Sequence, residues 1–327
     1  MAVRWGIVGA GGIAHRRTMS AINTAENSKL QALMVRDLER ARKLAEEHGA
    51  ESCYDSVDGV LSDPEVDAVH IATPVYLHRE HVIRAAEHGK HVLCEKPMAM
   101  SVDECRRMID ACDQNGVHLE VCFLLRFHPY YREIKQMIAE GKLGEIIEAR
   151  TSLMKWYPID EGLWRRDPVR AGGGVLMDLG PHVIDLLCYL LGDVSKVSAS
   201  ISSRVFKWEV EETGTVLMQM ESGAHAIVGS SFVVPHGGTM LEIYGTKGSV
   251  WVSEGKLKTY MNDNLQEKSE SAGNLYKPQL EHFSRCMDGK ENTIAPGMAG
   301  LKNIQVISAA YESARTGRII SIIDHAI

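Results

Sequence analysis

The 327-residue sequence has no excess of positive charge and no long apolar run. Lysine and arginine number 36 against 43 acidic residues, a formal net charge of −7. This balance gives no reason to expect nucleic acid or an anionic membrane as a partner. No uncharged apolar stretch reaches the roughly 18–20 residues that span a bilayer. The N-terminus also lacks the features of a secretory signal. These absences predict a cytoplasmic protein.

Paired cysteines and metal-binding motifs are absent as well. The seven cysteines are odd in number and contain no Cys-x-x-Cys pair, so they are expected to be free thiols in a reducing compartment. The segments His78–His81 and His88–His91 do not have the spacing His-Glu-x-x-His of a zinc site. No metal is therefore expected.

The first third of the chain alternates short apolar runs with amphipathic segments, a pattern typical of a doubly wound parallel sheet. Predicted strands are Val3–Val8, Leu30–Val35, Ala68–Ala72, His91–Cys94 and His118–Phe123. Predicted helices are Leu38–His48, Leu77–His88 and Val102–Asn115, which Gly49, Gly89 and Gly116 follow as C-caps. Residues 1–123 are thus expected to form a dinucleotide-binding Rossmann domain.

Beyond residue 123, strands follow one another without intervening helices. Strand-like segments are Ile146–Leu153, Lys196–Val205, Thr215–Glu221, Ala224–Val233, Leu241–Tyr244 and Ser249–Val252. Helices are predicted at Pro129–Glu140, Gln279–Met287 and Leu301–Arg315. This order favours an open, mostly antiparallel sheet with helices on one face. Residues 124–327 are expected to form an α+β domain for substrate binding and oligomer formation.

A glycine motif, Gly9-Ala10-Gly11-Gly12-Ile13-Ala14, follows the first strand and opens a helix. It has the Gly-x-Gly-x-x-Ala form of a dinucleotide site, in which glycines make a tight turn and admit the pyrophosphate to the helix N-terminus. A simple turn in a glycine-rich chain is the alternative, but the position at the first βα turn favours dinucleotide binding. The expected cofactor ligands here are Gly9, Gly11, Gly12, Ile13 and Ala14.

The end of the second strand bears on the choice between NAD and NADP. An acidic residue there is usual for NAD, whereas an arginine accommodates the 2′-phosphate of NADP. The sequence has Val35-Arg36-Asp37, in which Arg36 suits a phosphate and Asp37 can cap the next helix. A merely solvated Arg36 is the alternative. The cofactor is NADP or NAD, and these residues favour NADP.

Two further motifs carry candidate reactive groups. Glu95-Lys96-Pro97 ends a strand at the ligand-binding edge of the sheet, where a lysine can approach nicotinamide and a substrate hydroxyl; a surface lysine before a turn is the alternative. We predict a cis Lys96-Pro97 bond there. After Gly172-Gly173-Gly174, Asp178 and His182 have the spacing of one helix face, although Pro181 predicts a kink or a helix start near Met177–Pro181. A carboxylate beside a histidine can orient the imidazole for proton transfer, but such a histidine is more often structural.

Together these motifs resemble the Gfo/Idh/MocA oxidoreductases over essentially the whole chain. The resemblance also rests on the runs Lys90–Pro97, Arg126–Pro129, Trp164-Arg165, Asp178-x-Gly180-x-His182-x-x-Asp185 and Glu242–Ser249. It implies an NAD(P)-dependent oxidoreductase that acts on a hydroxyl-bearing carbon, or the corresponding ketone, of a sugar, cyclitol or related polyol.

The resemblance further implies roles for individual residues. His182 is expected to exchange the hydroxyl proton with the substrate. Asp178 is expected to orient the His182 imidazole, and Lys96 to polarise the substrate oxygen. The Arg36-Asp37 turn is similar to that of NADP-using members. The remaining expected cofactor ligands are Arg36, Asp37, Thr73, Pro74, His78, Glu95, Lys96, Trp164 and Arg165. The expected substrate ligands are Lys96, Arg126, Tyr157, Trp164, Asp178 and His182.

Two other functions fit the same scaffold. One is a glycosidase that retains NAD and cleaves through transient oxidation, and the other is a non-catalytic nucleotide or sugar sensor. The presence of Lys96, Asp178 and His182 argues against a sensor. Loop residues, among them Trp156 and His236–Gly238, are candidates for specificity, but they do not identify the substrate. The half-covered second sheet predicts a homo-oligomer, either a dimer or a tetramer.

Overall fold

The computed structural model describes residues 2–160 and 163–322. The chain divides into two compact units. Unit 1 comprises Met1–Leu124 and Gly273–Leu301, and unit 2 comprises Leu125–Ala272 and Lys302–Ile327. The outer ends of the two expected domains, residue 1 and residues 323–327, lie outside the described residues.

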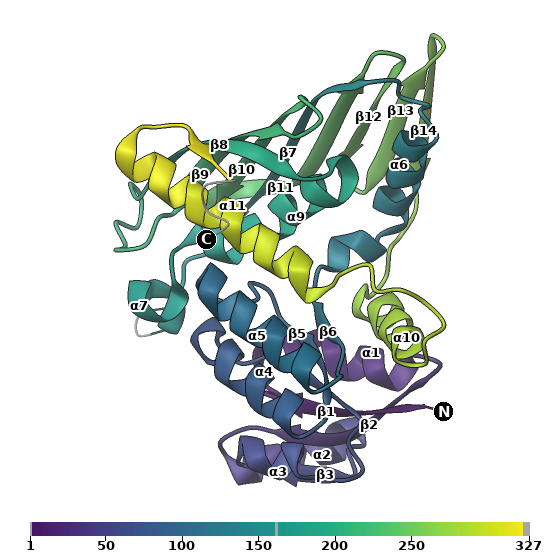
Figure 1. The fold of residues 1–327 in the computed structure, drawn as a ribbon, viewed down its shortest axis with the longest axis vertical. Helices are drawn as coiled ribbons and strands as arrows, with labels where there is room; N and C mark the ends of the chain where they lie inside the picture. Colours follow the sequence, from purple (N-terminus) through teal and green to yellow (C-terminus); the bar gives the residue numbers. More distant parts are fainter. Residues whose placement is uncertain (1, 161–162, 323–327) are drawn as a thin grey trace. The chain divides into compact units, whose positions relative to one another are not determined.

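Unit 1 is built on a six-stranded parallel sheet, which confirms the predicted doubly wound fold (Figure 1). Its strands are β1 (Val3–Val8), β2 (Ser28–Met34), β3 (Ser52–Tyr54), β4 (Ala68–Ile71), β5 (His91–Cys94) and β6 (Leu119–Val121). They lie in the order β3-β2-β1-β4-β5-β6, so the winding reverses between β1 and β4. In open α/β sheets, ligands bind at this reversal, beyond the carboxyl ends of the strands.

The helices of unit 1 follow the predicted pattern. They are η1 (Ala14–Thr18), α1 (Met19–Thr24), α2 (Leu38–His48), α3 (Val57–Leu61), η2 (Val75–Leu77), α4 (His78–Glu87), α5 (Val102–Gln114) and α10 (Tyr276–Met287). Gly49, Gly89 and Gly116 have φ values of 71°, 68° and 65°, which confirms them as left-handed residues at the helix ends. α10 follows the strands of unit 2 in sequence but packs in unit 1, where Phe283 lies 5.2 Å from Trp5 between ring centroids.

Unit 2 contains a nine-stranded, mostly antiparallel sheet, as predicted (Figure 1). Its strands are β7 (Ile146–Trp156), β8 (Val194–Ser202), β9 (Thr213–Met220), β10 (His225–Ser231), β11 (Val233–Gly245), β12 (Gly248–Ser253), β13 (Lys256–Met261), β14 (Asn264–Ser269) and β15 (Ile320–Ser321). They lie in the order β14-β13-β12-β11-β7-β10-β9-β8-β15, and only the pair β7 and β10 is parallel.

The two faces of this sheet differ in character because side chains alternate along each strand. One cross-strand row is buried: Met218, Ala226, Ala149, Ile243, Val250 and Thr259. The adjacent row projects to the opposite face: Leu217, Ile227, Arg150, Glu242, Trp251 and Lys258. Leu217 in this second row is 48% exposed. The sheet therefore has one core face and one mixed, partly exposed face.

The helices of unit 2 include the segment that carries two candidate catalytic residues. They are η3 (Leu124–Phe127), α6 (Pro129–Ala139), η4 (Trp164–Arg166), α7 (Pro168–Ala171), α8 (Val175–Asp178), α9 (Gly180–Leu191) and α11 (Gly297–Thr316), the last from Lys302 onward. α9 packs against β7 and β10. The helical segment Pro168–Asp178 meets α9 at 49°, and α9 begins at Gly180 with Pro181 in its first turn, which confirms the kink or helix start predicted near Met177–Pro181.

Among the described residues, no single helix has both the length and the apolar character of a membrane span. One bent pair, Pro168–Asp178 with Gly180–Leu191, meets these criteria by length and composition only.

Candidate active site

The glycine turn after β1 is tight on one side and open on the other. Gly9 has φ 92°, and a Cβ built on it would lie 2.9 Å from Thr73 in the loop after β4. For Gly11 the nearest described atom to such a Cβ is Arg40 Nη2 at 3.6 Å, and for Gly12 no described atom lies within 4 Å. Ala14 is fully buried, so the helix packs closely on the sheet. The turn therefore has the space that a pyrophosphate needs at the switch point between β1 and β4.

The residues after β2 have two roles: Asp37 caps a helix, and Arg36 is a candidate phosphate ligand. Asp37 Oδ1 accepts a hydrogen bond from the Arg40 backbone N–H at 3.1 Å, so it caps α2 as predicted. Arg36 is exposed. Arg40, which sequence reasoning did not single out, has its guanidinium beside Gly11. Its position in the first turn of α2, four residues after Arg36, was the only signal in the sequence.

The loop after β4 is fixed by two histidines. His78 is 1% exposed, with Nε2 2.8 Å from the Thr73 carbonyl oxygen and Nδ1 3.0 Å from that of Pro97. Burial lowers its pKa although these carbonyls oppose the shift. His81 Nδ1 lies 3.1 Å from Thr73 Oγ1, and burial lowers the His81 pKa to about 4. His78 thus ties the loop after β4 to the loop after β5.

The Glu95-Lys96-Pro97 segment stands at the carboxyl end of β5 with a cis Lys96-Pro97 bond, as predicted. Lys96 is half-buried, whereas the Glu95 carboxylate is buried. It accepts a hydrogen bond from Tyr276 Oη, lies 3.4 Å from His70 Nε2 and accepts the Lys96 backbone N–H at 3.3 Å. Burial alone raises the Glu95 pKa, but hydrogen bonding and charge from His70, with Tyr276 and Lys96, outweigh it and lower the value to about 2. An ionised carboxylate therefore adjoins Lys96.

In unit 2, Asp178 ends α8 and His182 lies in the first turn of α9, and both are half-buried. Asp178 Oδ2 lies 4.0 Å from Arg165 Nε. The Arg165 guanidinium in turn lies 4.4 Å from the Trp164 ring centroid. The structure thus brings three expected ligands together within unit 2: Trp164, Arg165 and Asp178.

Arg126 is held by a partner that sequence reasoning did not assign to it. Its Nε and Nη2 donate to the two carboxylate oxygens of Asp185 at 3.0 and 2.7 Å, and both side chains are at least nine-tenths buried. Burial raises the pKa of Asp185 against the opposing charge of Arg126. Because Asp185 lies one turn beyond His182, this ion pair anchors α9 to η3.

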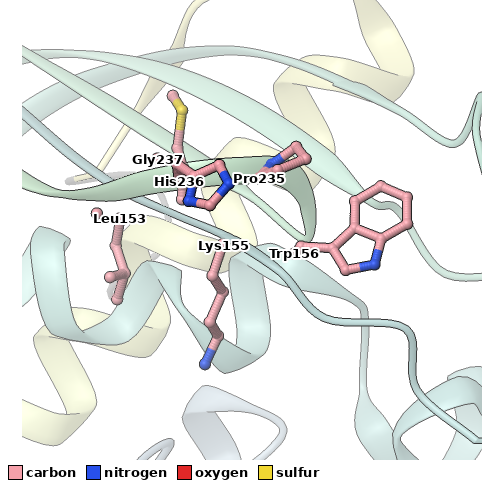
Figure 2. Close-up of a pocket in the computed structure, with 8 residues that line it drawn as sticks. Leu153, Lys155, Trp156, Pro235, His236 and Gly237 are labelled. Carbon is pink, nitrogen blue, oxygen red and sulfur yellow. The ribbon is translucent and has the colours of Figure 1, made fainter.

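A hollow of about 590 Å³ lies between the C-terminal end of β7 and the irregular part of β11. It brings together Trp156 and His236–Gly238, two of the segments proposed for specificity (Figure 2). Figure 2 shows Leu153 and Lys155 extending to the same side of β7. Tyr157 follows the last residue of β7. The Lys155 ammonium lies 4.8 Å from its ring centroid, and its backbone N–H donates to the Phe232 carbonyl oxygen.

Two buried clusters in unit 1 have the atom types of metal ligands. In His70–Glu95–Cys122 the carboxylate already accepts the Tyr276 hydroxyl, as described above. In Glu120–His282–Cys286 the His282 Nε2 accepts the Ile294 N–H at 3.2 Å, while Nδ1 lies 2.8 Å from Glu291. Hydrogen bonds thus already engage the Glu95 carboxylate of the first cluster and the His282 imidazole of the second.

Both parts of the chain match known family models. Residues 3–123 match the model described as oxidoreductase family, NAD-binding Rossmann fold, and residues 131–251 match the GFO/IDH/MocA C-terminal domain. The chain belongs to the Gfo/Idh/MocA oxidoreductase family. This confirms the resemblance seen in the motifs, and the protein is an NAD(P)-dependent oxidoreductase.

Individual Gfo/Idh/MocA relatives are similar over nearly the full length. The chain is 32% identical to the 1,5-anhydro-D-fructose reductase of Ensifer adhaerens, covering 98% of each chain. It is 29% identical to D-xylose 1-dehydrogenase (NADP(+)) 2 of Haloferax volcanii, over 97% of this chain and 99% of that one. The crystal structure of aldose-aldose oxidoreductase from Caulobacter crescentus superposes with a TM-score of 0.91 at 30% identity, covering 98% of this chain and all of the other.

Proposed function

We propose that the protein is an NADP-preferring dehydrogenase or reductase that acts on a carbinol carbon of a sugar, cyclitol or related polyol, or on the corresponding ketone. The observation that carries the proposal is the glycine turn, which keeps open space at Gly11 and Gly12 beside the switch point of the sheet. The relatives support the substrate class, because their names describe reactions of an anhydro-sugar and of xylose.

The preference for NADP rests on how the charges after β2 are used. Asp37 is engaged as the cap of α2, and Val35 has no polar group for a ribose hydroxyl. Arg36 is exposed, and Arg40 places its guanidinium beside Gly11. Two guanidinium groups near the adenosine end suit a 2′-phosphate better than a bare ribose.

The chemistry is proposed to use Lys96, Asp178 and His182. When bound, the nicotinamide accepts or supplies the hydride. In the direction of oxidation, His182 takes the proton that leaves the substrate hydroxyl, and in reduction it returns this proton. Asp178 stabilises the protonated imidazole, while Lys96 polarises the substrate oxygen. The Glu95 carboxylate accepts the Lys96 backbone N–H and so fixes the backbone that carries the lysine.

We also propose that the open face of the nine-stranded sheet mediates a homo-oligomer. Leu217, Ile227 and Trp251 belong to one cross-strand row on that face, and a row of this kind is suited to pairing with a second copy. Light scattering should find a dimer or tetramer, and a Leu217→Glu, Ile227→Glu double variant should shift it toward the monomer. A monomeric native protein would overturn this point.

The main experiment is a panel of polyols and keto-sugars assayed by nicotinamide absorbance with NAD(H) and with NADP(H). We expect turnover with at least one member and a higher kcat/KM with NADP(H). Cleavage of a glycoside by protein with retained cofactor, without net change in absorbance, would instead indicate the glycosidase. Binding of sugar without turnover of any kind would indicate the sensor.

A further inference from the structure

The glycine loop before α8 is packed against the Tyr311 side chain and the Glu211 backbone, from distant parts of unit 2. A Cβ built on Gly173 would lie 1.9 Å from Tyr311 Oη, and one on Gly174 would lie 2.0 Å from the Glu211 carbonyl oxygen. Neither position admits any side chain. Gly173 and Gly174 therefore let the backbone approach Tyr311 and Glu211 at contact distance.

Glu211 is the acceptor on which this loop converges. Its Oε2 accepts the Gly174 N–H at 2.8 Å, and its Oε1 accepts the Leu176 N–H at 2.9 Å and the Tyr311 hydroxyl at 2.8 Å. Its backbone carbonyl accepts the Val175 N–H at 3.0 Å. Glu211 is 8% exposed, so these bonds are shielded from water. The buried Glu211 thus holds the start of α8.

A short series of backbone hydrogen bonds leads from Glu211 to both candidate catalytic residues. Gly174 donates its N–H to Glu211, and its carbonyl oxygen accepts the Asp178 N–H at 3.0 Å. The Val175 carbonyl accepts the Leu179 N–H at 2.8 Å, and the Leu179 carbonyl accepts the His182 N–H at 3.2 Å. A displacement of the loop at Glu211 must therefore move the backbones of Asp178 and His182.

We propose that Glu211, held in place by Tyr311, is a positioning residue that sets the relative placement of Asp178 and His182. The proposal rests on the proposed function of these two residues. Each oxygen of the Glu211 carboxylate faces a donor, so an amide in its place would turn one NH₂ group toward a backbone N–H or the Tyr311 hydroxyl. Glu211→Gln should consequently displace the loop with almost no change in side-chain volume.

The neighbouring Glu212 provides a matched control. It is also buried, but its carboxylate accepts hydrogen bonds from the Ser203 hydroxyl and from the backbone N–H groups of Arg204, Val205 and Trp208. It therefore holds the loop between β8 and β9 and not the glycine loop. Glu212→Gln makes the same chemical change one residue away.

The test is the titration of the His182 imidazole in the full-length protein, followed by NMR with labelled histidine and assigned with His182→Asn. Glu211→Gln should shift the His182 midpoint by about half a pH unit or more, and Tyr311→Phe should shift it in the same direction. Glu212→Gln should leave it unchanged. The charged groups on the same helices and their partners, Asp178 with Arg165 and Asp185 with Arg126, are intact in every variant.

A purely structural role for Glu211 would lower the melting temperature and leave the His182 midpoint in place, which would overturn the proposal. An equal shift in Glu212→Gln would overturn it as well. If Glu211→Gln does not fold, Tyr311→Phe decides. Where the panel provides a substrate, Glu211→Gln should lower kcat about 10²-fold with NADP(H) affinity unchanged. Because the titration needs no substrate, failure of the panel and failure of this proposal can be distinguished.

Discussion

The two glycine-rich segments of this protein serve opposite purposes. In the segment Gly9–Gly12, Gly9 lies against Thr73, but Gly11 and Gly12 leave space that the described residues do not fill, with only Arg40 approaching Gly11. In the segment Gly172–Gly174, Gly173 and Gly174 leave space that Tyr311 and Glu211 occupy to within contact distance. The first segment leaves room for a ligand, whereas the second lets other residues of the same chain pack against its backbone. A glycine run in a sequence thus signals close approach without specifying what approaches.

The largest expected effect is on turnover. It sharpens the comparison of the two glycine segments because it separates catalysis, assigned to the residues after the second segment, from cofactor binding, assigned to the first. His182→Asn keeps size and hydrogen bonding but removes titration, so kcat should fall roughly 10²–10⁴-fold. NADP(H) affinity, which we assign to the first glycine segment, should be unchanged. Steady-state kinetics across pH and cofactor titration measure both. If His182→Asn keeps its kcat and its pH profile while Lys96→Met is inactive, the two residues must exchange roles.

The second prediction contrasts one glycine from each segment. Gly174→Ala places a methyl group against the Glu211 backbone and should destabilise the fold by about 1–3 kcal/mol. Gly11→Ala meets only the flexible end of Arg40, so it should keep its stability and weaken NADP(H) binding. Urea unfolding and fluorescence titration of NADPH test the pair. Equal stability of the two variants would break the comparison.

The third prediction concerns two arginines assigned to cofactor binding with the first glycine segment, Arg36 and Arg40. Arg36→Ala and Arg40→Ala should each weaken NADP(H) binding about tenfold relative to NAD(H), because each removes a charge-assisted bond to the 2′-phosphate. Arg42→Ala, an exposed arginine on the same helix, is the control and should change neither. An equal loss for both cofactors, or a native preference for NAD, would refute the assignment.

The smallest expected effect concerns how the free energy of unfolding depends on pH through Glu211, which packs against the second glycine segment, and its neighbour Glu212. Burial raises the pKa of Glu211 above its ordinary value of 4.5, against the hydrogen bonds from Leu176 and Tyr311. For Glu212, burial acts in the same direction, but the hydrogen bonds from Val205, Ser203 and their neighbours outweigh it and lower the pKa. The two adjacent glutamates are therefore shifted in opposite directions.

The signs follow from which state binds the proton. Above about pH 4.5 the folded protein retains a proton on Glu211 that the unfolded chain has released, so stability falls as pH rises toward the raised pKa. Below about pH 4.5 the unfolded chain binds a proton that folded Glu212 does not, so stability falls as pH falls. Glu211→Gln should remove the first dependence and Glu212→Gln the second, as measured by urea unfolding between about pH 3 and 7. The same slopes in both variants would contradict the opposed shifts.

The long periodic elements were predictable because their signals are local. Val3–Val8, His91–Cys94 and Leu38–His48 have the predicted bounds, and the kink near Pro181 was expected from one residue. The sequence pattern missed β3, which has three residues, and β14, whose six residues are all exposed and so have no apolar alternation. Short or fully exposed strands exist only because a neighbouring strand pairs with them.

The sequence by itself determined the dinucleotide turn, the helix caps and the two kinds of sheet, because each depends on residues within a few positions of one another. The tertiary structure alone decided the partners of the buried charges. Glu95 meets Tyr276 from 181 residues away, Arg126 meets Asp185 from 59 and Glu211 meets Tyr311 from 100. A buried carboxylate or guanidinium must be paired, but its own neighbourhood in the chain does not specify with what. Only the packing of distant elements supplies that partner, and with it the placement of Asp178 and His182.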